Sequence, residues 1–251
     1  MAKWWHVSWK RLVLLGVATY CALWLLAGTI QLISGQFTPW LLARDLKREN
    51  PQLSQIPIPI PDRSLLAIDG MRIEFYGASM DTPWKQISRQ KVSQSVSIWN
   101  FENGASLLVE NPSEIRDLAR LMRNQPQSVP FLGKDILQSE SSMFAAAMYS
   151  TPDGVKWWRP PAENAKAMTL TELKDIHCHN YGKLFSVSFG RMQGFQEGAL
   201  NAAPNKIVLN LFDPSDRHYQ IIITGDKGKP IPLTQAQLNS MIASIQPDPV
   251  R

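Results

Sequence analysis

Three histidines have the side-chain chemistry of a metal site. His177 and His179 flank Cys178, and His218 lies further along the chain. On a helix, residues two apart point about 200° away from each other, so His177 and His179 could share a metal only if they lay on a strand. Because a helix is predicted here, we interpret His177 as part of its buried face and His179 as a partner of its negative end. We therefore expect no metal and no other cofactor.

A second candidate site is the aromatic segment Trp157, Trp158 and Arg159, followed by two prolines. Neighbouring side chains on a strand point to opposite faces, so one tryptophan is expected at the surface beside the arginine. Tryptophan and arginine are enriched among the residues that dominate protein–protein binding. The alternative is that one tryptophan fills the core while the other packs beneath the proline-containing loop.

A third candidate is the segment from Gly190 to Pro204, which is long for a hairpin connection. It contains Met192 and Phe195. Long loops with apolar residues are often contact surfaces, and others are disordered, so both interpretations stay open. We include Met192 and Phe195 among the candidate binding residues.

Catalytic motifs are absent from the sequence. It contains no nucleophile elbow, phosphate-binding glycine loop, paired-histidine zinc helix or calcium-binding loop. Asp213 and Asp216 flank a proline and are interpreted as turn residues. We therefore expect a protein that is not an enzyme.

The longest apolar segment is residues 12–34, which contain no charged residue. As a helix this segment would be roughly 34 Å long, enough to cross a bilayer, and a cleaved secretory signal usually has a shorter apolar region. It predicts an N-terminal single transmembrane helix acting as a signal anchor. Residues 1–11 combine tryptophans with basic residues, which is typical of a membrane interface. Basic residues next to the span favour a single-pass inner-membrane protein with its C-terminal domain outside the cytoplasm.

Residues 35–62 are predicted to connect this span to the domain. Leu41, Leu42 and Leu46 fall near one face of a short helix that would lie at the membrane interface, and the alternative is a solvated stalk. The following IPIPIP sequence lacks three amide donors and restrains its backbone to extended geometry. It is therefore interpreted as a stiff spacer.

The net charge of +5 does not indicate a nucleic-acid-binding protein. Residues 1–56 carry +4 of it, which leaves +1 for the rest of the chain. Basic residues flanking an apolar segment suit anionic headgroups, and a nearly neutral domain has no electrostatic footprint for DNA or RNA.

Residues 63–251 are predicted to form one α+β domain. Capping residues predict helices that begin after Asn111, Thr169 and Thr234, the last two with Glu172 and Gln237 as capping-box partners. An alanine- and methionine-rich helix is expected at 135–149, and a short strand at 155–158. Alternating stretches predict the longer strands, with a type I′ turn at Asn103 and Gly104: 71–76, 95–101, 105–110, 183–189, 206–212 and 218–224. Short turns between strands favour an antiparallel sheet covered by helices.

The order of these elements resembles the PsbP-like fold. The resemblance covers Leu65 to Pro247 and rests on an opening strand leading to Pro83 and Trp84, the Asn-Gly hairpin, a helix beginning Asn-Pro-Ser-Glu, and a last helix ending MIASIQP. The two helices expected between Asp135 and His179 depart from it. An extrinsic photosystem subunit, a Ran-binding import factor and small bacterial cell-envelope proteins share that fold. The resemblance implies a domain that binds other proteins without catalysis.

Three functions follow from these observations. The first is a membrane-anchored protein whose extracytoplasmic domain binds another protein of the envelope or membrane. The second is a domain that binds a lipid or small hydrophobic ligand between sheet and helices. The third is a metal-dependent hydrolase that uses His177, His179 and His218.

Overall fold

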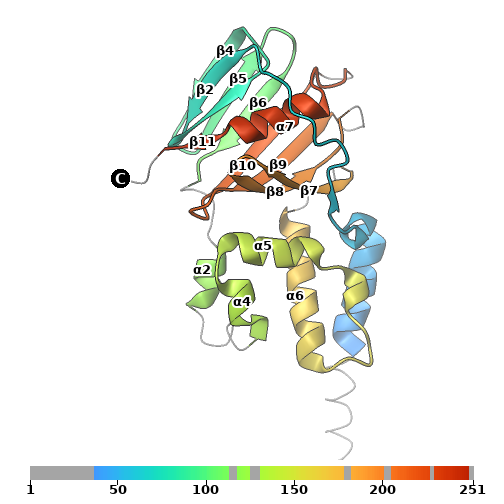
Figure 1. Ribbon diagram of the computed structural model, residues 1–251. Helices are drawn as coiled ribbons and strands as arrows, with labels where there is room; N and C mark the ends of the chain where they lie inside the picture. The colour runs from blue at the N-terminus through green and yellow to red at the C-terminus, as the bar shows by residue number, and fades with distance from the viewer. Residues whose placement is uncertain are drawn as a thin grey trace, which may run out of the picture.

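The chain folds into a sheet unit and a helical unit, which lie one above the other in Figure 1. This computed structural model of the 251-residue chain describes residues 37–112, 118–124, 131–177, 182–200, 205–226 and 229–248. The sheet unit is formed by two segments of the chain, and most of the helical unit is inserted between them.

In the described part of the chain, the larger sheet has eight strands in the order β1-β7-β8-β9-β10-β6-β5-β4. All neighbouring strands are antiparallel except β1 and β7, which are parallel. Its strands are β1 (Ile58–Pro59), β4 (Ile87–Val92), β5 (Val96–Phe101), β6 (Ser106–Glu110), β7 (Leu184–Phe189), β8 (Met192–Glu197), β9 (Lys206–Phe212) and β10 (His218–Thr224). A smaller sheet contains β2 (Met71–Phe75), β3 (Ala78–Thr82) and β11 (Gln246–Pro247).

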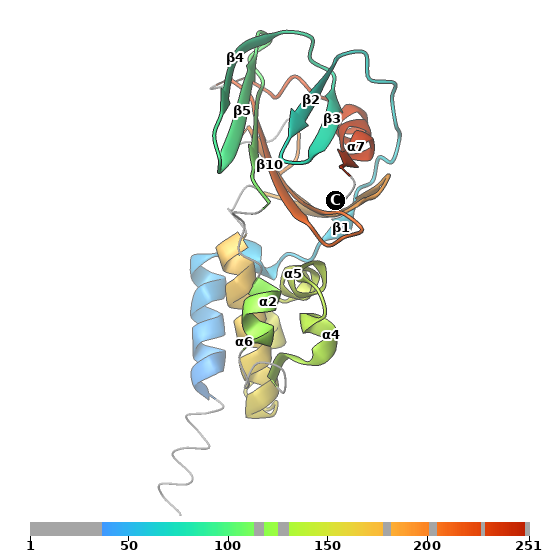
Figure 2. The ribbon, with the colours of Figure 1, turned by 90° about the vertical axis from the view of Figure 1, so that its left-hand side faces the viewer.

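One face of the large sheet forms the main hydrophobic core. Side chains alternate between the faces of a strand, so β9 and β10 each place every second residue in this core. Helix α7 (Gln235–Ser244) and the smaller sheet cover that face (Figure 2). The predicted capping box of Thr234 and Gln237 begins α7 and is confirmed. The apolar side of α7 and its C-cap are buried in the main core through Leu238, Met241, Ile242 and Ile245.

The helical unit lies at the other face of the large sheet (Figure 2). Between β6 and β7 it contains α2 (Leu118–Arg123), α4 (Lys134–Leu137), α5 (Glu140–Tyr149), the 3-10 helix η2 (Pro152–Gly154) and α6 (Pro161–His177). A helix over residues 37–49 and the 3-10 helix η1 (Pro51–Ser54) join it from the N-terminal side. Trp40, Ala43 and Leu46 of this first helix pack against Val155 and Met168.

Helix α5 joins the two units through an aromatic contact and a helix cap. Phe144 packs against Phe195 of β8 and Phe212 of β9, with ring centroids 5.8 and 5.4 Å away. The Asp216 carboxylate, in the turn before β10, accepts hydrogen bonds from the first amides of α5, those of Glu140 (2.6 Å) and Ser141 (3.0 Å). A carboxylate at this position satisfies free amides and complements the positive end of the helix.

A buried ammonium group holds the helical unit together. Lys174 of α6 is completely inaccessible to solvent, and its Nζ donates hydrogen bonds to the carbonyls of Leu53 (3.1 Å), Ser150 (3.0 Å) and Gln55. Two of these carbonyls belong to the η1 region, and the third follows the last residue of α5. A buried ammonium group is tolerated only when its N–H groups donate hydrogen bonds. The three segments that supply the acceptors must therefore remain together around Lys174.

The predicted membrane-spanning helix is not among the helices that the structure describes. No helix in the part of the chain that the structure describes is long and apolar enough to cross a membrane. The predicted combination of helices with a largely antiparallel sheet is found, but the description as a single-pass protein with a signal anchor is withdrawn. Residues 1–11 and 12–34 lie outside the described residues. The prediction depended on the lack of charge in that segment, a compositional property that does not by itself define a helix.

The segment predicted as a connection packs onto the fold. Leu41 and Leu42 are about half exposed, 48% and 49%, and the packed face of the helix over residues 37–49 is instead that of Trp40, Ala43 and Leu46. The IPIPIP sequence pairs with β7 as a two-residue strand and contributes Ile60 to the main core. Prolines are tolerated in β1 because it is an edge strand.

Local predictions in the domain were correct for most strands and wrong at several boundaries. The β5–β6 hairpin is confirmed, but Gly104 alone has a positive φ and the Gly104 amide donates to the carbonyl of Phe101, which is a type I turn followed by a bulge. The predicted helix 135–149 is divided into α4 and α5 because Ser139 caps α5. Helix α6 begins at Pro161 instead of near Thr169, because proline fits a first helical turn. Residues 155–158 form no strand.

We expect the Lys174→Met variant to be less stable than wild type by about 3 kcal/mol, because the thioether fills the space but leaves buried carbonyls without a donor. Urea unfolding of both proteins measures this difference. Lys134→Met, at an exposed lysine of α4, is the matched control and should change stability by less than about 0.5 kcal/mol. Equal stabilities of the two variants would contradict a structural role for Lys174.

Candidate functional site

The loop between α5 and α6 displays two tryptophans. Trp157 and Trp158 are 48% and 63% exposed. One exposed tryptophan beside Arg159 was expected, but the second is exposed as well, so the alternative that places one ring in the core and the other beneath the loop is wrong. The ring of Trp157 stacks on Phe37, with centroids 6.0 Å apart and planes 18° apart, and meets Trp158 edge-on at 5.7 Å. Lys156 Nζ lies 5.8 Å from the centroid of the Trp158 ring. We call Phe37, Lys156, Trp157, Trp158 and Arg159 the aromatic surface.

Hydrogen bonds hold this loop in place. The fully buried Asn164 side chain accepts from the amide of Lys156 (2.9 Å) and donates to its carbonyl (2.6 Å). Arg159 Nη1 donates to the carbonyl of Gly154 at 2.9 Å. The two tryptophans are therefore exposed on a loop whose backbone is hydrogen-bonded to the Asn164 side chain of α6. Phe37 was not predicted as a site residue, because the sequence gives no sign that it meets Trp157, 120 positions later. Lys156 was also missed, although it directly precedes Trp157.

Met192 and Phe195 lie elsewhere and do not belong to the aromatic surface. Both are on β8, with 1% and 6% of their areas exposed, and they pack in two different core clusters. The predicted long loop begins instead with a two-residue turn at Gly190 and Arg191, which pairs Phe189 with Met192. Gly190 has a φ of 58°, the positive value that this kind of tight hairpin requires at its first central position.

The predicted histidines do not converge on a metal site in the described residues. His177 and His218 contact the same ring, that of Phe144, with centroids 4.9 and 5.3 Å away, and His179 lies outside the described residues. Nowhere in the described part of the chain do three or more His, Cys, Asp or Glu side chains lie where they could share a metal.

His218 is a buried, neutral imidazole. It stacks on Phe212 with centroids 4.5 Å apart, and its Nε2 lies 3.1 Å from Asn210 Oδ1. Burial, together with the nearby His177, lowers the pKa of His218 to about 3, against a smaller opposing effect of the Asp216 carboxylate. At neutral pH this histidine therefore contributes to packing and hydrogen bonding without charge.

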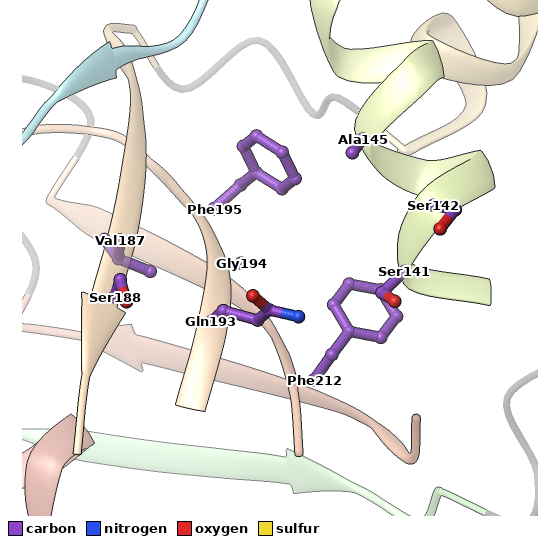
Figure 3. Close-up of a pocket in the computed structure, with 9 residues that line it drawn as sticks. All are labelled: Ser141, Ser142, Ala145, Val187, Ser188, Gln193, Gly194, Phe195 and Phe212. Atoms are coloured by element: carbon purple, nitrogen blue, oxygen red, sulfur yellow. The ribbon is translucent and has the colours of Figure 1, made fainter. Parts of the chain in front are cut away.

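A cavity of about 290 Å³ lies between α5 and the strands β7, β8 and β9 (Figure 3). Ser141 and Ala145 face it from α5, Ser188 from β7, Gln193 and Phe195 from β8, and Phe212 from β9. Figure 3 shows the two phenylalanine rings between the strands and the helix. Its residues come from three separated segments, so no local sequence pattern indicated it.

Comparisons with protein-family models, with curated proteins and with solved structures give no match to this chain. The resemblance to the PsbP-like fold therefore stays a prediction. The geometry of the aromatic surface and of the cavity carries the functional inference.

Acidification should destabilise the wild-type protein more than a His218→Gln variant. The glutamine side chain still offers an N–H donor but does not titrate. Unfolded His218 takes up a proton near its ordinary pKa of 6.5, whereas the folded residue does so only near 3, so stability is lost as the pH falls between these values. Between pH 7 and pH 4 the wild type should lose about 3 kcal/mol more than the variant, measured by urea unfolding. A difference between the two proteins that is independent of pH would contradict this assignment.

Proposed function

We propose that the chain is a non-catalytic protein-binding module, and that the aromatic surface contacts a partner segment with apolar and acidic side chains. The single observation that supports this most is the exposure of two adjacent tryptophans on a loop that is fastened to α6. Most of the area of Trp158 and nearly half of that of Trp157 is in contact with water in the free protein. Burying such side chains is a main source of binding energy at protein interfaces.

The fastened loop favours binding for an entropic reason. A flexible loop must be ordered when a partner binds, and this ordering reduces affinity. Here the buried Asn164 side chain already fixes the backbone of Lys156, and Phe37 already supports one face of Trp157. A partner would therefore meet aromatic side chains that are close to their bound arrangement.

The charges beside the tryptophans indicate the character of the partner. Lys156 and Arg159 flank the two rings, and Arg159 is exposed. The nearest carboxylate on η2, that of Asp153, is paired with Lys47 at 2.8 Å. Complementary charge steers association and suppresses incorrect partners. The surface is thus suited to a protein segment that carries a carboxylate next to an aliphatic or aromatic side chain.

We expect the double variant Trp157→Ala, Trp158→Ala to lose its partner. The experiment is crosslinking in native cell material, followed by purification of the full-length chain and quantification of a stoichiometric companion protein. Removing two central aromatic side chains should weaken that complex about 30-fold or more, the equivalent of about 2 kcal/mol. Reversing the charge with Lys156→Glu should also weaken this complex, and the loss of affinity should be smaller at high salt because salt screens charges.

The matched control is the double variant Leu65→Ala, Leu66→Ala. These neighbours are also apolar and exposed, at 56% and 50%, but they lie outside the aromatic surface. Equal loss of the companion protein in both double variants would contradict the proposal. It would also fail if the tryptophan variant lost only sedimentation with phosphatidylglycerol vesicles, because the surface would then recognise lipid instead of protein.

A further inference from the structure

We propose that the cavity between α5 and the large sheet binds a small, uncharged molecule with an aromatic ring at one end and a hydroxyl or amide group at the other. The cavity shares no residue with the aromatic surface, so this inference does not rest on the proposed protein-binding function. Figure 3 shows its two kinds of lining, with phenyl rings beside hydroxyl and amide groups.

The aromatic part of the lining suits a flat ring. Phe195 and Phe212 line the cavity. Both rings pack against the ring of Phe144 on α5, with centroids 5.8 and 5.4 Å away. Ala145, the α5 residue after Phe144, presents only a methyl group. Aromatic rings prefer offset or edge-on contacts at such separations, so a ligand ring would extend an existing aromatic cluster.

Two polar side chains lie at the mouth of the cavity. Ser188 and Gln193 are exposed, and within the described part of the chain neither side chain makes a hydrogen bond. On the helix side, Ser141 and Ser142 are already linked to the capping hydroxyl of Ser139, at 3.1 and 2.7 Å. The hydroxyl of Ser188 and the amide of Gln193 are therefore the groups that would recognise the polar end of a ligand.

The lining favours an uncharged ligand. Its residues are serine, alanine, valine, glutamine, glycine and phenylalanine, none of which is ionised. The nearby Asp216 carboxylate already accepts from the amides of Glu140 and Ser141. A charged group would lose hydration here without gaining an opposite charge, which is unfavourable.

The size of the cavity limits the ligand further. A volume of about 290 Å³ is enough for a ligand of about ten non-hydrogen atoms. A lipid with two acyl chains is far larger. The chemical class that fits is therefore a small aromatic alcohol or amide.

The test is a titration of the full-length protein with matched probes. Binding is monitored by NMR, through the backbone amide resonances of Gly194 and Gln193. The probes 2-phenylethanol, ethylbenzene, phenylacetate and 2-phenylethylamine share one ring and differ in the polar end. We expect saturable shifts with 2-phenylethanol, and at least tenfold weaker binding of the two charged probes. No saturation with 2-phenylethanol, or equal binding of a charged probe, would overturn the proposal.

Two variants locate the binding. Ser188→Phe should abolish binding by filling the mouth, whereas Arg191→Phe, at an exposed position in the adjoining turn, should leave it unchanged. Gln193→Ala should weaken 2-phenylethanol about fivefold without affecting ethylbenzene. If Ser188→Phe disturbs folding, the Gln193 variant still decides, because equal affinities of 2-phenylethanol in the variant and in wild type would refute the assigned polar end. The Trp157→Ala, Trp158→Ala protein should bind 2-phenylethanol normally, which separates this site from the protein-binding surface.

Discussion

The buried ammonium of Lys174 is the interaction on which the aromatic surface depends. It donates to Leu53 and Gln55, which follow the helix carrying Phe37, and to Ser150, which precedes the loop carrying the tryptophans. Removing an ammonium from water costs several kcal/mol unless its protons are donated, so these acceptors have to be present together. One charge on α6 thereby fixes the positions of two chain segments whose aromatic rings, those of Phe37 and Trp157, stack on each other.

The cavity follows from the unequal covering of the two faces of the large sheet. One face is closed by α7 and the smaller sheet, and its side chains form the main core. The other face is met by α5, which contacts the strands through Phe144 but presents small residues such as Ser141 and Ala145 beside them. The wall at Gly194 is bare backbone, since a Cβ atom there would lie 1.9 Å from the carbonyl oxygen of Asn210. The hollow is thus a consequence of small side chains at the contact of helix and sheet.

The parts of the fold that could be predicted are those with complete local patterns. Strands β9 and β10 place an apolar residue at every second position in the main core, and α7 carries both its capping box and its apolar stripe. Strand β8 could not be predicted in this way, because Met192 and Phe195 are three residues apart and pack on opposite faces. Lys174 has the appearance of a solvent-facing lysine, and its burial depends on carbonyls about 120 positions earlier in the chain.

The candidate site was predictable in composition but not in geometry. Adjacent tryptophans cannot both point inward from a strand, which correctly indicated exposure near Trp157, but the loop exposes both rings because Asn164 holds the backbone in a turn. Folding alone gives no reason for this arrangement, since exposed aromatic area contributes nothing to stability, and polar side chains at these positions would leave the hydrogen bonds of Asn164 intact. The free energy that the fold does not gain by burying Trp158 remains available for association. This unused free energy of burial, more than the presence of tryptophan itself, is the physical basis for assigning a binding role to this loop.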